Sequence, residues 1–182
     1  MKLAIIDPLG LCYDGSTLTH RGLGGSESAV ILIARELVQL GFDVTVYNNC
    51  RDSTHSAPGV YDGVRYVDNS DARTVDECYD VVIVSRTVTP FVSSGWPFVR
   101  RASKRILWLH DTFIEGDQIM EDLVVSGKID HVFTLSDWHT SYILNSDHGK
   151  KRNYEVLKRK IFQTRNGAVC HIPEGDLSKK DP

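Results

Sequence analysis

Short apolar runs and segments with helical spacing alternate along the chain. The first run, Leu3 to Ile6, ends in Asp7-Pro8-Leu9-Gly10 and predicts a strand that enters a loop. Beyond this glycine-rich loop, apolar residues recur at helical spacing at Val30, Ile33, Leu37 and Leu40. That spacing predicts an amphipathic helix, with polar residues on its other side.

The ends of this helix carry suitable boundary residues. Ser26 fits the N-cap position, and Gly41 follows the last periodic residue, where a C-terminal glycine belongs. The segment 42–47 then alternates and is rich in β-branched and aromatic residues, which predicts a second strand. A strand, a glycine-containing loop, a helix and a strand form the unit from which parallel sheets are built.

Similar units follow along the chain. Further strands are expected at 79–85, 105–111, 130–135 and 160–164, with an extra edge strand at 64–67. Helices are expected near 97–103, 117–125, 138–144 and 154–158. This order predicts an α/β fold, namely a Rossmann-like, doubly wound, mainly parallel open sheet with helices on both faces. We expect residues 1–172 to form one domain and the polar residues 173–182 to be a linker toward a second domain.

Composition narrows the class of protein. The chain has 182 residues, of which 41% are hydrophobic and 25% charged, as in an ordinary globular domain. Its formal net charge of -3 argues against nucleic acid as a partner and against a general attraction to anionic lipid. Basic clusters at 150–152 and 158–160 fit either the solvated face of a helix or a binding patch.

The cysteines and the apolar runs indicate a cytoplasmic protein. The four cysteines form no Cys-x-x-Cys pair and have no histidine at metal-ligand spacing, so no zinc or other metal site is expected. Scattered reduced thiols fit the cytoplasm better than a disulfide framework does. The apolar run at the start is too short for a signal peptide, and no run reaches the roughly 20 residues that cross a bilayer. We therefore expect any membrane contact to be peripheral.

Ligands of open α/β sheets bind beyond the carboxyl ends of the strands. This rule selects Asp7, Gly24-Gly25, Ser85-Arg86, His110-Asp111 and Ser136. The two glycines immediately before a helix let the backbone approach a ligand, and the helix N-terminus suits a phosphate. The segment matches neither the dinucleotide fingerprint nor a Walker loop, and a tight turn with an ordinary N-cap would explain it equally well.

Four segments, in this order, resemble the N-terminal domain of family 4 retaining glycosyltransferases of the GT-B fold. The first is Gly24-Gly25-Ser26-Glu27 at the start of a helix, followed by the Leu40–Tyr47 segment. The others are a strand ending in His110, a strand running into Ser136 at the start of a helix, and Asn166-Gly167 near the end of the chain. Together the four segments span nearly the whole chain.

The resemblance implies two Rossmann-like domains, with the nucleotide-sugar held mainly by the C-terminal one. It implies metal-independent transfer of a sugar, without a cofactor, to a hydroxyl of a glycan, a lipid-linked acceptor or a small molecule. The family's Glu-x7-Glu motif belongs to the second domain and has no convincing equivalent here. The chain alone is therefore expected to be inactive without a C-terminal domain or a partner subunit. Two alternatives stay open: a stand-alone module that binds a nucleotide or glycan, and a non-catalytic subunit of a split glycosyltransferase.

The resemblance also suggests roles for individual residues. Gly24, Gly25, Ser26 and Glu27 would contact the donor phosphates, although Glu27 is also a favourable first-turn acid. His110 would be the catalytic residue, with a hydrogen-bonded structural histidine as the alternative.

Residues assigned to the acceptor or the cleft are Asp111, Arg86, Ser136 and Trp96, and each has an alternative. Asp111 could instead orient His110 or cap a helix, Arg86 could form a surface salt bridge, and Ser136 could be an N-cap. The tryptophans are expected in packing positions, with Trp96 the one to test for an acceptor role. The loops 10–23 and 87–96 are expected to select the acceptor.

Overall fold

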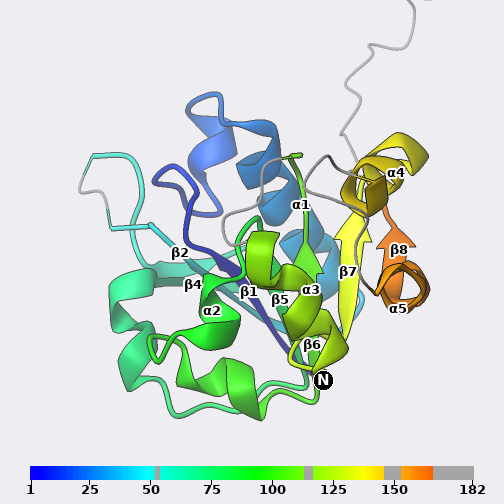
Figure 1. The fold of residues 1–182 in the computed structure, drawn as a ribbon. Coiled ribbons are helices and arrows are strands. Elements are labelled where there is room, and N and C mark those ends of the chain that lie inside the picture. Colours follow the sequence, from blue (N-terminus) through cyan, green and yellow to red (C-terminus); the bar gives the residue numbers. More distant parts are fainter. Residues whose placement is uncertain (52–53, 113–116, 146–152, 166–182) are drawn as a thin grey trace, which may run out of the picture.

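The computed structural model describes residues 1–51, 54–112, 117–145 and 153–165. They form an eight-stranded, mostly parallel open sheet in the order β3-β4-β2-β1-β5-β6-β7-β8 (Figure 1). Its strands are β1 Lys2–Asp7, β2 Asp43–Asn48, β3 Gly59–Tyr61, β4 Val64–Asp68, β5 Val81–Ser85, β6 Lys104–Trp108, β7 His131–Thr134 and β8 Ile161–Gln163. The pairing of β3 with β4 is antiparallel. The α/β class and the mainly parallel sheet predicted from the sequence are confirmed.

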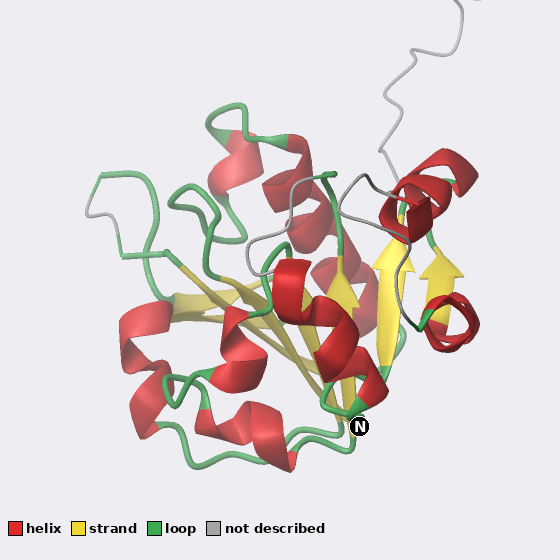
Figure 2. Cartoon of the chain, viewed as in Figure 1, coloured by secondary structure: helices red, strands yellow, loops and turns green. Residues whose placement is uncertain are grey.

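Helices cover both faces of this sheet (Figure 2). The α-helices are α1 Gly25–Gln39, α2 Thr89–Val92, α3 Asp117–Val125, α4 Asp137–Asn145 and α5 Tyr154–Lys160. Shorter 3-10 helices are η1 Thr17–Thr19, η2 Asn69–Thr74 and η3 Pro97–Arg101. The helices predicted near 117–125, 138–144 and 154–158 are thus confirmed within a few residues.

Two apolar cores follow from the alternation of side chains along each strand. On β1, Leu3 and Ile5 pack with residues of α1, whereas Ala4 and Ile6 pack in the cluster that contains residues of α2, η3 and α3. Side chains of a strand point alternately to the two faces, so each strand contributes to both cores. This explains why the central strands are nearly continuous in apolar residues.

The strand order reverses between β1 and β5. From β1 the chain continues outward to β2 and β4, and then returns to pair β5 with the other edge of β1. The loops that follow β1 and β5 therefore leave the same edge of the sheet in opposite directions. In open α/β sheets a ligand crevice forms at such a point.

Several local predictions were wrong. The strand at 64–67 is not an edge strand, because β3 pairs with it and forms the edge itself. Ser26 is not the N-cap of α1, because Gly24 has extended backbone angles and the helix begins at Gly25. The helix predicted at 97–103 is a 3-10 helix over Pro97–Arg101.

The helix end at Gly41 was predicted correctly, since this residue has a φ of 86° directly after the C-cap Leu40. The family-like Asn166-Gly167 segment and the predicted linker at 173–182 lie outside the described residues. So does the basic cluster at 150–152, whereas Lys158, Arg159 and Lys160 form the last turn of α5.

Candidate functional site

The carboxyl edge of the sheet brings together side chains from β1, β5 and β6 below the first turn of α1. Ile5 and Trp108 belong to the core on the α1 side. Asp7 stands two residues after Ile5, and His110 stands two residues after Trp108. Ser85 pairs with Trp108 in the parallel pairing of β5 with β6. The alternation of side chains therefore directs Asp7 and Ser85 toward the α1 face of the sheet. His110 lies beyond the end of β6, near enough to Arg86 and Glu27 for their charges to act on its pKa.

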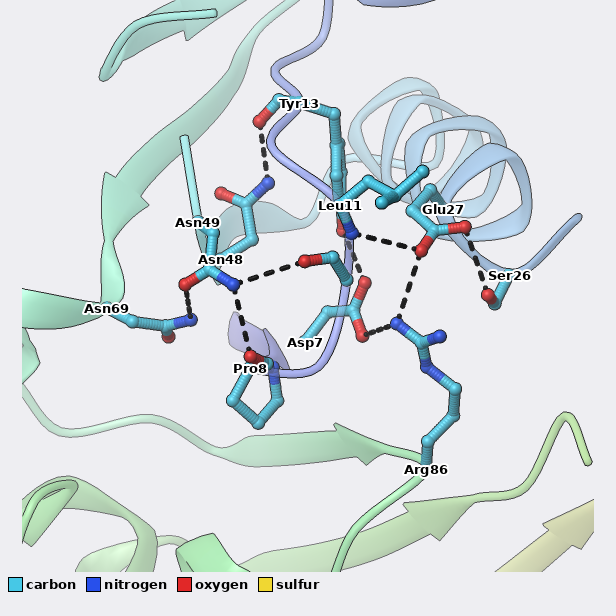
Figure 3. A network of polar contacts seen from close by, with 11 residues as sticks. Asp7, Pro8, Leu11, Tyr13, Ser26, Glu27, Asn48, Asn49, Asn69 and Arg86 are labelled. Atoms are coloured by element: carbon cyan, nitrogen blue, oxygen red, sulfur yellow. Dashed lines mark hydrogen bonds and ion pairs between the residues drawn. The ribbon is translucent and has the colours of Figure 1, made fainter. Parts of the chain in front are cut away.

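Arg86 links two buried carboxylates at this edge. Its guanidinium points between Asp7 and Glu27 (Figure 3). The Nη2 atom lies 2.8 Å from Asp7 Oδ1 and 3.4 Å from Glu27 Oε1. The side chain of Arg86 is only 14% exposed, and those of Asp7 and Glu27 are 0% and 5% exposed. The sequence alternatives for Arg86 included a surface salt bridge, but this ion pair is buried.

The charges of this network are set by burial and by Arg86. Burial raises the pKa of Asp7, and the nearby Arg86 offsets only part of that rise. The pKa of Glu27 is lowered, because backbone N–H groups, Arg86 and Ser26 together outweigh its burial. The two carboxylates raise the pKa of Arg86 against the effect of its own burial. Arg86 therefore stays charged and holds both acids in place.

Backbone and side-chain contacts fix the loop that follows β1. The Tyr13 hydroxyl donates to Asp7 Oδ2 at 3.0 Å, and the Leu11 N–H donates to Glu27 Oε1 at 3.2 Å. From the end of β2, Asn48 Nδ2 donates to the Tyr13 carbonyl at 2.7 Å. Asn49 Nδ2 donates to the carbonyls of Pro8 and Gly10. Figure 3 shows how these contacts connect the loop with α1 and β2.

The first turn of α1 already holds a carboxylate. The Glu27 side chain accepts hydrogen bonds from its own backbone N–H and from Ser26 Oγ. A Cβ atom at Gly24 would lie 2.3 Å from Glu27 Oε2, whereas one at Gly25 would meet nothing within 4 Å. A side chain at position 24 would therefore force the Glu27 carboxylate to shift from its present place. Both glycines, Ser26 and Glu27 lie together at the helix N-terminus, as the sequence predicted.

His110 follows β6 and is neutral. Burial, followed by the charge of Arg86, lowers the pKa of His110 to about 4. Its ring packs against Trp108 with a centroid distance of 4.2 Å. Among the described residues, neither ring nitrogen of His110 has a hydrogen-bond partner, although both are buried. Within the described residues, the alternative of a hydrogen-bonded structural histidine thus finds no hydrogen-bond partner for the ring.

Other buried donors near His110 are also unpaired. Ser85 Oγ, Arg86 Nε and Trp108 Nε1 lack partners among the described residues. An unpaired buried polar group costs about 1–3 kcal/mol, so several on adjoining strand ends require a physical explanation. A bound ligand or ordered water at this edge would supply the missing partners.

A small pocket of about 180 Å³ opens beside His110 and is lined also by Asp111, Thr112, Leu135, Ser136, Trp138 and His139. Ser136 accepts a hydrogen bond from the His139 N–H at 3.0 Å, so its predicted N-cap role is confirmed, and it lines the pocket as well. His139 Nε2 lies 3.0 Å from the Asp111 carbonyl. Because a carbonyl only accepts, Nε2 carries the proton. His139 Nδ1 correspondingly accepts from the Leu135 N–H at 3.3 Å.

A second pocket of about 410 Å³ lies between the loops that follow β1 and β2. Asp14 joins the two loops, since its carboxylate accepts from the N–H groups of Ser16 and Ala57, each at 2.8 Å. This pocket includes part of the 10–23 loop, to which the sequence assigned acceptor selection.

The structure unites most, but not all, of the predicted site residues. Gly24 to Glu27 and Arg86 form one group, and His110, Asp111 and Ser136 form a second, connected through the influence of Arg86 and Glu27 on His110. Trp96 lies apart, since it packs partly buried against the core on the other face of the sheet.

Sequence reasoning missed Tyr13, Trp138 and His139 as parts of the site. For His139 a signal was present, because it stands three residues after the N-cap Ser136, where its N–H must meet the cap. No pattern marked Tyr13. Trp138 was expected in a packing position, but it is 67% exposed.

In the part of the chain that the structure describes, no cluster of three or more His, Cys, Asp or Glu side chains could hold a metal ion. None of the described helices has both the length and the apolar character needed to span a bilayer. Cys12, Cys50 and Cys78 are free thiols. Comparison with models of known protein families gives no match, and a search of curated proteins finds no similar protein either.

Proposed function

We propose that this chain is the acceptor-side, N-terminal domain of a retaining glycosyltransferase with the doubly wound GT-B architecture. Its partner would be a donor-binding domain, present on the same polypeptide or on a separate subunit. The reaction transfers a sugar from a nucleotide-sugar to an acceptor hydroxyl. The bond from the anomeric carbon to the diphosphate breaks, a bond from that carbon to the acceptor oxygen forms, and the proton of the acceptor hydroxyl passes to the departing diphosphate.

One observation carries the proposal: His110, at the carboxyl edge of the sheet and one strand beyond the point where the strand order reverses, is neutral, and its two buried ring nitrogens have no partner among the described residues. With a pKa of about 4, the imidazole is uncharged at neutral pH. It can therefore accept a hydrogen bond from an acceptor hydroxyl at one nitrogen and donate one at the other. That capacity suits the orientation of a hydroxyl nucleophile.

The turn at Gly24-Gly25 supplies the second part of the proposed site. The first N–H groups of a helix lack partners within the helix, and its dipole favours an anion there. Arg86 lies 2.8 Å from Asp7 and 3.4 Å from Glu27, so its fixed positive charge offsets part of the negative charge of these two carboxylates beside the turn. The donor diphosphate would approach this turn when the second domain closes over it.

The test compares the domain with and without its partner. A protein that joins this domain to its donor-binding domain is expected to release nucleotide from a UDP-, GDP- or ADP-sugar and to form a glycoside with retained anomeric configuration. The 182-residue chain alone is expected to give no transfer. His110→Ala should lower turnover about 10²- to 10⁴-fold, the range for loss of an acid–base group.

His131→Gln is the matched control, because His131 begins β7 at the amino end of the sheet, away from the site. This variant should keep nearly full activity. Absence of nucleotide release and transfer across the whole donor panel would overturn the proposal. Tight nucleotide or glycan binding by the chain in calorimetry, without turnover by the joined protein, would favour a stand-alone binding module instead.

A further inference from the structure

An exposed aromatic pair lies beside the His110 pocket. Trp138 is 67% exposed and Tyr142 is 41% exposed, and both stand on α4. Their rings stack with a centroid distance of 5.5 Å and an interplanar angle of 29°. Of the three tryptophans, Trp108 is buried and Trp96 is partly buried in the core. Trp138 is therefore the tryptophan whose ring is available to a ligand.

The geometry of the helix directs this ring toward the pocket. Side chains of an α-helix lean toward its N-terminus, and residues four apart lie on the same face. Tyr142 therefore covers one side of Trp138 from the following turn, and the indole leans toward the loop that precedes α4. Trp138 accordingly lines the pocket together with His110, Asp111 and Ser136.

The first turn of α4 is held rigidly, so the indole has a fixed support. Ser136 caps the turn, and the neighbouring His139 is hydrogen-bonded at both ring nitrogens to Leu135 and Asp111. The hydroxyls of Thr134 and Thr140 lie 2.6 Å apart and connect the end of β7 to the helix. A preorganised aromatic surface loses little entropy when a ligand binds.

We propose that the Trp138–Tyr142 pair is a stacking platform for a pyranose ring, so that the acceptor of the proposed transfer is itself a glycoside. The faces of aromatic rings carry negative charge density, which attracts the weakly positive C–H groups on the apolar face of a sugar. The hydroxyls at the rim of the sugar then meet polar groups of the pocket at Asp111, Thr112 and Ser136. This arrangement brings one sugar hydroxyl toward His110.

The assignment to a glycoside rests on the composition of the pocket. Its cavity of about 180 Å³ combines one open aromatic ring with a few polar groups at close range, the mixture that fixes the orientation of a small ligand. A lipid chain would gain nothing from Asp111, Ser136 and His110. The inference rests on the proposed function where it calls this sugar the acceptor, whereas the binding of a glycoside can be tested separately.

The experiment titrates the whole chain with a panel of methyl α- and β-glycosides of glucose, galactose, mannose and N-acetylglucosamine. Acrylamide quenching of tryptophan fluorescence reports mainly Trp138, because the other two tryptophans are partly or fully buried. At least one glycoside is expected to protect Trp138 from the quencher. Trp138→Ala should weaken binding of that glycoside about tenfold in calorimetry, and Trp138→Phe should restore part of the loss.

Phe162→Ala is the control, since Phe162 is also exposed, at 48%, but does not line the pocket. It should leave glycoside binding unchanged. If no glycoside of the panel protects Trp138, or if Trp138→Ala binds as well as the parent chain, the inference is wrong. Protection of Trp138 by phosphatidylglycerol vesicles but by no glycoside would likewise overturn it.

Failure of the inference and failure of the proposed function give different results. Transfer by the joined protein with an unchanged acceptor KM in Trp138→Ala would contradict the platform alone. Glycoside binding through Trp138 without any transfer would contradict the transferase function and leave the binding site standing. If both proposals hold, Trp138→Ala raises the acceptor KM about tenfold with little change in kcat, as expected for a contact that binds substrate and transition state equally.

Discussion

At Arg86 an unfavourable backbone conformation accompanies favourable ion contacts of the side chain. Its φ of 67° lies in the left-handed region, which costs a non-glycine residue about 1 kcal/mol or more. This conformation carries the side chain from the end of β5 to Asp7 and Glu27, where it forms two buried ion contacts. The strained backbone therefore persists because the charge of Arg86 satisfies two carboxylates that would otherwise be buried without a cation.

Replacement of Arg86 by methionine should destabilise the fold by about 3–5 kcal/mol at pH 7, because it leaves two carboxylates in a buried site without their cation. Urea unfolding followed by circular dichroism measures this change. The loss should shrink as the pH falls. Without Arg86 the pKa of Asp7, already raised by burial, rises further, so the folded variant takes up a proton more readily than the unfolded chain does.

Arg101→Met is the control for this prediction. Arg101 pairs with Asp76 at 2.7 Å, but the side chains are 40% and 93% exposed. Surface ion pairs contribute about 0–1 kcal/mol, so this variant should unfold close to the parent chain. Equal losses in Arg86→Met and Arg101→Met would contradict the assignment of a buried network.

At the residue scale the sequence predicted which residues reach the carboxyl edge, but not how they pair. The rule for parallel sheets selected Asp7, Arg86 and His110 from their positions after apolar runs. It could not show that Arg86 lies between Asp7 and Glu27, because residues 7 and 86 meet through the register of β1 and β5, and Glu27 joins them through the packing of α1 on the sheet. The exposure of Trp138 was equally hidden, since it depends on the face that α4 turns to the sheet.

At the scale of elements, the start of α1 depends on the absence of one side chain. A Cβ at Gly24 would lie 2.3 Å from the Glu27 carboxylate, which Leu11 and Arg86 hold in place. We expect Gly24→Ala to destabilise the fold by about 1–2 kcal/mol, as overpacking does. A Cβ at position 25 would meet nothing within 4 Å, so Gly25→Ala should leave the stability of the fold unchanged or raise it by about 0.5 kcal/mol.

Chemical unfolding of these two matched variants measures the difference, and a double variant tests its cause. In the background of Glu27→Ala, the contact that penalises Gly24→Ala is gone, so the alanine should cost much less there. An equal cost of Gly24→Ala in both backgrounds would show that Glu27 is not the group that excludes a Cβ atom.

The longer elements were predictable because their patterns are local, whereas short ones were not. The 3.6-residue spacing predicted α1, apolar runs predicted β1, β5 and β6, and the alternation of β-branched and aromatic residues predicted β2. The hairpin of β3 and β4 was missed although Asp62-Gly63 is a strong signal for a two-residue turn. Both residues have positive φ, at 49° and 78°, as a type I′ turn requires. The three-residue strand β3 is too short to show alternation, and β4 is the strand it pairs with in the described sheet.

At the scale of the whole molecule, burial of a neutral histidine makes stability depend on pH. The pKa of His110 is about 4 in the folded state, against an ordinary value near 6.5 in the unfolded chain. Between these values the unfolded chain binds the extra proton, so stability falls as the pH is lowered through this range. The lowered pKa values of Asp14, Glu27, Asp68 and Glu77 act in the same direction, but at more acid pH.

The change in unfolding free energy between pH 7 and pH 5 therefore depends mainly on His110. The raised pKa of Asp7 changes it in the opposite direction. We expect this histidine to remove about 1–2 kcal/mol of unfolding free energy over that interval. His110→Phe cannot take up a proton, so its stability should fall by that much less between the two pH values. Urea unfolding of both proteins at each pH gives the comparison independently of their absolute stabilities, and histidine NMR titrates the imidazole directly. Two outcomes would contradict this prediction: parallel pH profiles of the two proteins, or an imidazole of His110 that titrates near 6.5. Either one would mean that the ring is solvated in the folded chain. The uncharged imidazole on which the proposed chemistry depends would then be absent at pH values below 6.5.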